Sequence, residues 1–349
     1  MNPLLPRSFW PSVHRVLAGG QWPPDSPEAA RRLIEGCGRH GILPLLLAED
    51  DLPPTLKRAL DAAAGWRRIL EMRAARFHEA TEAVCGLFAD DPVLLIKGAD
   101  YAHRIYPNLV LRPMQDVDFL VPADRLDQAC DRLARAGLRR VLFTPVQADP
   151  AYHERIFAMG KLVVEVHDAF IQRPRHRIDY EEVWRRRVPL AVGAQPCFRL
   201  DDVDAVAYHA LSMAIDEFRV RLIRYVDLWL LLRQREGLAL AAAERAREWQ
   251  SARSLYGALS LACRVFPDFR SEDVREAMAR VVPAPTARLL DRLVLPPPSA
   301  LGRRSPTPPV VRYWRKAALM DGTGRRLAFA LFHARAVARG WSWRAKRGR

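Results

Sequence analysis

Two aspartates that could hold a metal ion, Asp116 and Asp118, lie one residue apart in the apolar stretch RPMQDVDFLV. The run VDFLV predicts a β-strand, whose alternate side chains share a face, so both carboxylates are expected on one face, about 6 to 7 Å apart. Anions at that separation raise each other's pKa, and a divalent cation such as magnesium, which prefers oxygen ligands, would compensate the repulsion. Two solvated aspartates on an edge strand are the alternative, and the Asp-x-Asp pattern alone favours it.

The neighbouring segments carry further groups that suit phosphate chemistry. Upstream, LLIKGAD predicts a strand that runs through Gly98 into a helix, a turn whose backbone N–H groups suit a phosphate, and Lys97 would add a charge. Downstream, KLVVEVHDAF predicts a strand with Glu165 and His167 on one face, which makes Glu165 a candidate third carboxylate. A phosphate cradle and three carboxylates on strand ends are typical of two-metal phosphoryl transfer.

The elements that must position these groups occupy the middle of the chain. Residues 1–90 have helical periodicity, and from residue 201 the pattern is helical again. Between them, strands are predicted at 93–98, 117–122, 139–144 and 161–170, with helices at 99–107 and 124–137, which is a mixed α/β pattern. Residues 283–309 contain eight prolines, which predicts a linker or wrapping arm rather than a packed element. The sequence therefore predicts five parts. They are an N-terminal helical region (1–90), an α/β domain (91–200), a C-terminal helical domain (201–282), a proline-rich linker (283–310) and a basic amphipathic tail (311–349).

The ordered set of motifs resembles a known family. LLIKGADYAHRIYPNLVLRPMQDVDFLV is similar to the bacterial uncharacterised nucleotidyltransferase family, within the DNA polymerase beta-like superfamily, in its Lys-Gly, Tyr-Pro, Arg-Pro and Asp-x-Asp elements. The resemblance extends over roughly residues 25–270. It includes four further segments: GILPLLLAED, LPPTLKRAL, VVEVH and YHALSMAIDEFRVRLIRYVDLWLLL. The resemblance implies an α+β fold, in which a small mixed-sheet nucleotidyltransferase domain is flanked by N-terminal and C-terminal helical regions.

The resemblance also implies roles for individual residues. Asp116, Asp118 and Glu165 would be catalytic and would bind two magnesium ions, and Glu165 would help to activate an acceptor hydroxyl. The residues that bind the NTP would be Lys97, Gly98, Ala99 and Arg112.

Two positions depart from the family pattern. Ala99 stands where many superfamily members carry a glycine or serine that contacts phosphate, and Asp168 stands where relatives carry an aromatic residue. The backbone N–H of Ala99 can still donate, but a hydroxyl contact is lost, which puts the vigour of catalysis in question and not the fold.

The predicted activity is Mg²⁺-dependent transfer of a nucleoside monophosphate from an NTP, with ATP favoured, to an unidentified acceptor. By resemblance, a ribosomally made modified peptide or another secondary metabolite is the favoured acceptor. Two alternatives stay open: a catalytically inactive binding protein that keeps the fold, which Ala99 favours, and an enzyme that nucleotidylates protein or tRNA.

Several other polar residues have both a functional and a structural interpretation. Arg112 could contact nucleotide phosphate or clamp Asp116, although Arg-Pro is also ordinary in a loop, and His167 could orient a carboxylate. Asp227, in the apolar helix RYVDLWLLL, is expected in a buried structural network with Arg224 or His209. The acids Asp201, Asp202 and Asp204 are interpreted as a cluster at a helix N-terminus.

Net charge and cysteine content limit the function classes. Residues 300–349 carry 13 Lys+Arg and one acid, Asp321, so this segment holds +12 of the total +15 and the rest of the chain is nearly neutral. The tail is therefore expected to contact an acidic partner, RNA or an anionic membrane surface, or to be a solvated arm.

The cysteine content indicates the compartment. The five cysteines are scattered and form no CxxC pair, and the sequence has neither a long apolar run nor a secretory signal pattern. Reduced thiols in a cytoplasmic protein are therefore predicted. The many Arg, Ala and Pro residues fit a GC-rich bacterial genome.

Overall fold

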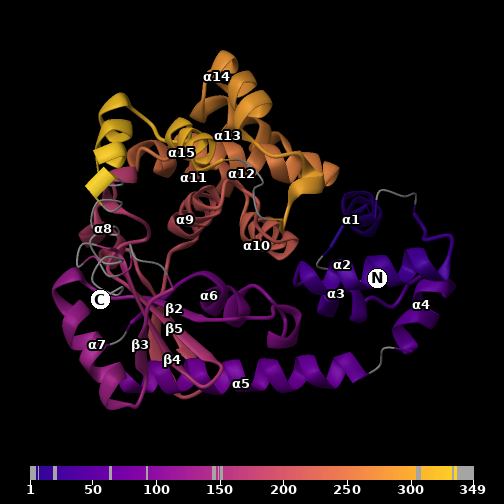
Figure 1. Cartoon of the computed structure of the whole chain (residues 1–349), viewed down its shortest axis with the longest axis horizontal. Coiled ribbons are helices and arrows are strands. Elements are labelled where there is room, and N and C mark those ends of the chain that lie inside the picture. The colour runs from indigo at the N-terminus through magenta and orange to yellow at the C-terminus, as the bar shows by residue number, and fades with distance from the viewer. Residues whose placement is uncertain are drawn as a thin grey trace, which may run out of the picture.

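The computed structural model describes most of the chain, with two helical parts around a sheet (Figure 1). The seven-stranded mixed sheet and its surrounding helices make the fold class α+β, as the sequence predicts. The described residues are 5–6, 8–18, 22–62, 65–91, 93–143, 147, 149, 152–303, 308–331 and 334–335.

The N-terminal part is helical, as predicted. The Ser26 hydroxyl accepts a hydrogen bond from the N–H of Ala29 at 3.2 Å and Pro27 opens the helix, so the capping residues fix where the second helix begins. The long helix α5 runs from the N-terminal helices to the sheet, along the bottom of Figure 1. The helices are α1 (Phe9–Ala18), α2 (Pro27–Arg39), α3 (Leu43–Leu47), α4 (Pro54–Asp61) and α5 (Gly65–Leu87).

The sheet has the strand order β3-β4-β5-β2-β1-β7-β6. Strand β2 (Val117–Leu120) is central, parallel to β5 (Leu162–His167) and antiparallel to β1 (Leu94–Leu95). The other strands are β3 (Arg139–Val141), β4 (Glu154–Met159), β6 (Val188–Val192) and β7 (Gln195–Arg199). The helices of this region are α6 (Lys97–Arg104), α7 (Leu126–Arg135) and α8 (Tyr180–Arg185), with 3-10 turns at Leu109–Leu111, Ala123–Arg125 and Arg173–Arg175.

Two hairpins lie where the sequence predicts one strand or none. Strands β4 and β5 are joined through Gly160 and Lys161, and β6 and β7 through Gly193 and Ala194. Both glycines have a positive φ, +61° and +57°, which suits the first position of a two-residue turn between antiparallel strands. The strand predicted at 93–98 is shorter than expected, because helix α6 already begins at Lys97.

Both faces of the central strand β2 are buried. Val117, Phe119 and Val166 face a smaller core that includes side chains of α5 and α7. Leu120, on the opposite face, belongs to the main core, which the N-terminal helices share with the C-terminal helices. Because β2 is central and Asp118 is 1% exposed, the interpretation of Asp118 as a solvated aspartate on an edge strand is wrong.

The C-terminal part is a helical layer that lies above the sheet in Figure 1. The Asp201 side chain accepts a hydrogen bond from the N–H of Asp204 at 2.7 Å, so the predicted acidic N-terminus of the first helix is confirmed. The helices are α9 (Asp202–Ile215), α10 (Leu222–Leu232), α11 (Leu238–Glu248), α12 (Ala252–Val265), α13 (Glu272–Val281), α14 (Ala284–Leu289) and α15 (Pro309–Ala318). Shorter helical segments are Pro267–Phe269, Leu290–Val294 and Pro298–Ala300.

The expectation that the proline-rich segment is unpacked is wrong for residues 290–301. Leu290, Val294, Leu295 and Leu301 are buried in the main core. Here prolines begin α14 and the 3-10 turn Pro298–Ala300, and the apolar residues between them supply the contacts. Within the predicted basic tail, residues 323–331 are helical and Phe329 is buried, while 336–349 lie outside the described residues.

The five cysteines are free thiols; four are buried, and Cys130 is half-buried. Among the described residues, none of the helices combines the length and apolar character that crossing a bilayer requires.

Candidate functional site

The register between β2 and β5 places two of the predicted site residues side by side. Asp118 is the direct partner of Glu165 in the parallel ladder. Both side chains lie on the face opposite the smaller core, because Val117 and Val166, their chain neighbours, point into that core. The alternation expected from the sequence thus brings these two carboxylates together on one face.

The positively charged group closest to this pair of carboxylates is the ammonium of Lys97. Lys97 Nζ lies 2.5 Å from Asp118 Oδ1 and 3.5 Å from Glu165 Oε2. The Lys97 side chain is 22% exposed and that of Asp118 only 2%, so the ammonium closes the pair toward solvent. Lys97 has a φ of +54°, in the left-handed region that costs a non-glycine residue about 1 kcal/mol. This strained backbone directs the lysine toward the carboxylates from the first position of α6.

His167 contacts the same two carboxylates from the strand that carries Glu165. Its Nε2 lies 3.0 Å from Asp118 Oδ1 and 3.5 Å from Glu165 Oε2, and the side chain is 1% exposed. Burial lowers the pKa of His167, but the hydrogen bonds to Asp118 and Glu165 outweigh it and raise the pKa to about 9. The predicted role of His167 in orienting a carboxylate fits this geometry.

The carboxylates of the site differ in their surroundings. Burial opposes ionisation of Glu165, but the Lys97 ammonium and His167 lower its pKa to about 2. Burial, and next the charge of Asp118, raise the pKa of Asp116. Asp116 precedes β2, is half-buried and has no hydrogen bond or ion pair to any other described side chain. Its carboxylate is therefore the one left for an external cation or substrate.

The donor atoms of the cluster could hold a metal ion. Asp118, Glu165 and His167 each offer a ligand atom, and these atoms lie within 4.8 Å of one another. Asp116 lies outside this set in the present side-chain arrangement.

The predicted phosphate turn is the buried first turn of α6. Gly98 and Ala99 are buried, and no side chain caps the N–H groups of this turn. A Cβ on Gly98 would lie 3.3 Å from Arg112 Nη1, so the glycine allows the guanidinium to pack against the helix. The uncapped N–H groups remain possible donors to a phosphate.

Arg112 is engaged in a structural contact. Its Nε and Nη2 each donate to one oxygen of Asp227 at 2.8 Å, and Nη1 donates to the carbonyl of Pro113. Tyr106 also donates to Asp227 at 2.8 Å. The expected buried network around Asp227 is confirmed, but the expected partners were wrong. Neither Arg224 nor His209 is hydrogen-bonded to Asp227; the His209 ring pairs with the Arg224 carbonyl. The contacts of Arg112 therefore favour a structural role over a clamp on Asp116.

A second ion-pair chain attaches α6 to the C-terminal helices. Arg104 donates to both oxygens of the buried Asp100 and, through Nη1, to Asp202 at 3.0 Å. Arg199 shares the same Asp202 oxygen at 3.0 Å. Together with Arg112, this chain fixes the helix that presents Lys97.

Two residues near the site were missed by sequence reasoning. His153 and Glu154, where β4 begins, lie beside His167, because Glu154 is the ladder partner of His167. The signal was the hairpin ERIFAMGKLVVEVH, in which Gly160 marks a turn and Glu154 is in register with His167. Without that strand, an isolated His-Glu pair has the appearance of a polar loop.

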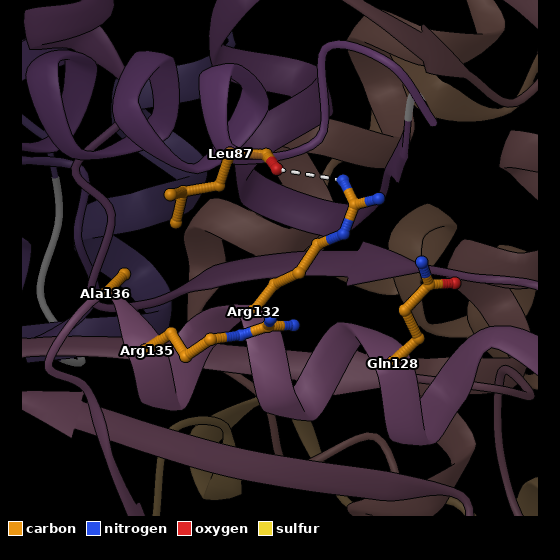
Figure 2. Close-up of a pocket in the computed structure, with 5 residues that line it drawn as sticks. All are labelled: Leu87, Gln128, Arg132, Arg135 and Ala136. Atoms are coloured by element: carbon orange, nitrogen blue, oxygen red, sulfur yellow. Dashed lines mark hydrogen bonds between the residues drawn. The ribbon is translucent and has the colours of Figure 1, made fainter.

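A surface pocket between the end of α5 and α7 is unrelated to this cluster (Figure 2). Arg132 in its wall donates to the carbonyl of Leu87 at 3.2 Å and to both oxygens of Asp90, so this cation is already paired. None of the predicted site residues lines it; the lining residues are Leu87, Gln128, Arg132, Arg135 and Ala136.

Comparison with known families agrees with the geometry. The family described as "uncharacterised nucleotidyltransferase" matches residues 26–267. The chain belongs to this family. The match spans the sheet, every predicted site residue and the helices on both sides, so the family assignment covers the cluster around Asp118. Comparison with curated proteins gives no significant match.

Proposed function

We propose that this member of the family transfers a nucleoside monophosphate from an NTP, with ATP favoured, to an acceptor hydroxyl. The observation that carries the proposal is the ladder pair Asp118 and Glu165, with Lys97 between them at the uncapped start of α6. Carboxylates for metal ions and N–H donors for phosphate thus meet at one place, as transfer at phosphorus requires.

Magnesium suits the oxygen donors of this cluster. Asp116, Asp118 and Glu165 would hold it, and His167 would support them from Nε2. When bound, the metal supplies the positive charge that neutralises the transferring phosphoryl group. The partly exposed Asp116, which has no side-chain partner in the described part of the chain, offers its carboxylate to the metal ion or to an incoming nucleotide.

The remaining steps belong to the residues of the chain. The ammonium of Lys97 moves from the carboxylates to the nucleotide phosphates, and the N–H groups at the start of α6 bind them as well. Glu165, which Lys97 no longer pairs, accepts the proton of the acceptor hydroxyl. The acceptor oxygen bonds to the α-phosphorus, the bond from that phosphorus to the bridging oxygen breaks, and pyrophosphate leaves with the electron pair.

A second candidate is a binding protein that keeps the fold without catalysis. The short contact between Lys97 and Asp118 favours it, because the ammonium and the carboxylate are already paired without a ligand. A peptide or other small secondary metabolite stays the favoured acceptor, and protein or tRNA the alternative. The basic tail would position the acceptor or contact an acidic partner, RNA or a membrane surface. The cytoplasmic location also stays a prediction.

Two measurements test the proposal. ATP titration with and without Mg²⁺ should show metal-dependent binding that Asp116→Ala abolishes, and binding that the variant retains would reject the metal assignment. Intact-mass analysis of candidate acceptors, incubated with each NTP and Mg²⁺, should show the added mass of one nucleoside monophosphate. Metal-dependent ATP binding with no mass shift on any acceptor class would favour the binding-protein candidate.

A further inference from the structure

A second group of metal-ligating side chains lies beside the carboxylate cluster. His153, Glu154 and His167 each offer one ligand atom, and these atoms lie within 4.8 Å of one another. His153 Nε2 is 3.5 Å from Glu154 Oε2, and His167 Nδ1 is 4.0 Å from the same oxygen. The group is well shielded, since the side chains of His153 and His167 are 5% and 1% exposed and that of Glu154 14%.

The two ring nitrogens of His167 point to different partners. Nε2 lies 3.0 Å from Asp118 Oδ1, so an Nε2–H group donates to that carboxylate. Nδ1 is fully buried and has no hydrogen-bond partner among the described residues. The buried Nδ1 faces Glu154 Oε2 at 4.0 Å, which is too long for a hydrogen bond, and a metal ion bound there would displace the proton that this nitrogen carries when the ring is charged. A buried ring nitrogen without a hydrogen-bond partner that faces a carboxylate oxygen is a place for a metal ion.

Glu154 is oriented for the same position. Gln147 Nε2 donates to Glu154 Oε1 at 3.1 Å, and the Gln147 carbonyl oxygen accepts from the N–H of Phe143 at 2.8 Å, which fixes the amide. The other oxygen, Oε2, is thereby left toward the two histidines. Ligand bonds of about 2.0 to 2.2 Å to one ion give separations between ligand atoms of about 3 to 4 Å, which the distances of 3.5 and 4.0 Å match.

We propose that His153, Glu154 and His167 bind one divalent transition-metal ion, of the zinc type, at a site separate from the proposed magnesium site. Two imidazoles and one carboxylate favour such an ion over magnesium, and three protein ligands leave a fourth position open. The hydrogen bond from His167 Nε2 to Asp118 is the support that a metal-bound imidazole usually receives from a carboxylate. The ion fixes the tautomer of His167 and hence the orientation of Asp118. This inference does not depend on nucleotidyl transfer.

The test is zinc binding by the full-length chain in buffer that contains excess Mg²⁺. We expect one equivalent of Zn²⁺ by calorimetry and by metal analysis after dialysis. We expect a loss of affinity of about 100-fold or more in His153→Ala and in Glu154→Gln, because a lost ligand costs more than a lost outer-shell partner. Asp116→Asn should retain the zinc and lose Mg²⁺-dependent ATP binding, which separates the two sites.

The matched control is His103→Ala. His103 Nε2 lies 3.2 Å from His78 Nδ1, so this pair is the other place among the described residues where two imidazoles meet closely. Asp118→Asn, which keeps the ligands but changes the support, should weaken zinc binding about 10- to 100-fold. Co²⁺ in place of Zn²⁺ should give visible ligand-field bands that His153→Ala abolishes. The proposal is overturned if the wild type binds no zinc, or if both ligand variants, shown folded by circular dichroism, bind it as the wild type does.

Discussion

Lys97 Nζ lies 2.5 Å from Asp118 Oδ1, and this contact supplies the positive charge that the sequence assigns to magnesium. A buried carboxylate requires a compensating charge, and a tethered ammonium meets that need without a ligand. The same contact means that a metal ion must displace the lysine in order to bind Asp118. Lys97 is thus placed to exchange between carboxylate and nucleotide phosphate.

The exchange predicts that Lys97→Met changes stability in a metal-dependent way. In EDTA, loss of the ammonium breaks its buried ion pair with Asp118, which keeps His167 as a partner, and should lower the free energy of unfolding by about 3 kcal/mol. In saturating Mg²⁺ the deficit should shrink, because the ion takes the place of the ammonium. Urea unfolding in both buffers measures this, with Lys57→Met, at an exposed position, as the control. An equal deficit in both buffers would show that Lys97 and magnesium do not compete.

The two aspartates of the strand should respond differently to loss of charge. Asp116→Asn should change the free energy of unfolding by less than about 0.5 kcal/mol, because Asp116 has no side-chain partner among the described residues and its charge repels Asp118. Asp118→Asn should cost about 3 to 5 kcal/mol, because Lys97 and His167 lose their shared carboxylate. Both should abolish Mg²⁺-dependent ATP binding. Normal ATP affinity in a folded Asp116→Asn protein would remove this residue from the site.

The Arg112–Asp227 pair should behave as a structural unit. Asp227→Asn leaves a buried guanidinium with a neutral partner and should cost about 3 kcal/mol or more. The double variant Arg112→Met, Asp227→Leu should be more stable than the sum of the single changes predicts, which a double-mutant cycle in urea measures. The ATP affinity of the folded double variant distinguishes a structural role of Arg112 from a role in nucleotide binding. A large loss of affinity would assign Arg112 to nucleotide binding.

The sequence predicted that Asp118 faces away from the core, with Glu165 as a further carboxylate beside Asp116 and Asp118, because side-chain alternation is a local property of strands. Val117 and Phe119 had to face a core, so Asp118 had to face away from it, and the same holds for Glu165 between Val164 and Val166. The partner of Asp118 was not predictable in this way. Lys97 reaches it only because the helix begins one residue before the glycine and with a left-handed φ.

Contacts between distant segments account for what sequence reasoning missed. Arg112 and Asp227 are 115 residues apart, and periodicity carries no information on such pairs. Strands β6 and β7 contain Pro189 and Pro196, and a proline within a run argues against the interior of a strand, so their pattern did not predict a hairpin. The proline-rich segment was not predicted to pack because its proline content obscured the apolar residues between the prolines, Leu290, Val294, Leu295 and Leu301.

His209 should make stability fall in acid. Burial, and next the charge of Arg224, lower its pKa to about 3, and Nε2 pairs with the Arg224 carbonyl at 2.7 Å. Because this value lies below the ordinary 6.5, the stability contributed by the neutral ring is complete above pH 6.5 and is lost as pH falls toward 3. Relative to His209→Gln, the wild type should lose about 4 kcal/mol over this range in urea unfolding. The pKa of His40 is lowered to about 4, so the wild type should also lose stability in acid relative to His40→Gln, but by a smaller amount. Parallel pH curves for wild type and His209→Gln would contradict the assignment.

Asp321 should anchor the basic C-terminal segment by capping a helix distant in sequence. Its Oδ2 accepts from the N–H of Ala252 at 2.6 Å and its Oδ1 from that of Arg253 at 3.4 Å, while Ser251 gives α12 no side-chain cap. Asp321→Ala should cost about 1 to 2 kcal/mol in urea unfolding, and Asp321→Asn less, because the amide keeps an acceptor without the charge. Asp51→Ala, at an exposed acid, is the control. A loss no larger than the control's would remove Asp321 as a cap.

The same contacts decide how the tail must be tested for acceptor, RNA or liposome binding. Deletion of 300–349 removes Asp321 together with Leu301 and Leu319, which are 2% exposed in the main core. That deletion should lower the free energy of unfolding by more than Asp321→Ala does, so lost affinity after it would report damage to the fold as well. Deletion of 336–349 removes five basic residues and no acid while it keeps these contacts. If the tail binds an anionic partner, the short deletion should weaken that binding, and the remaining affinity should become less sensitive to salt.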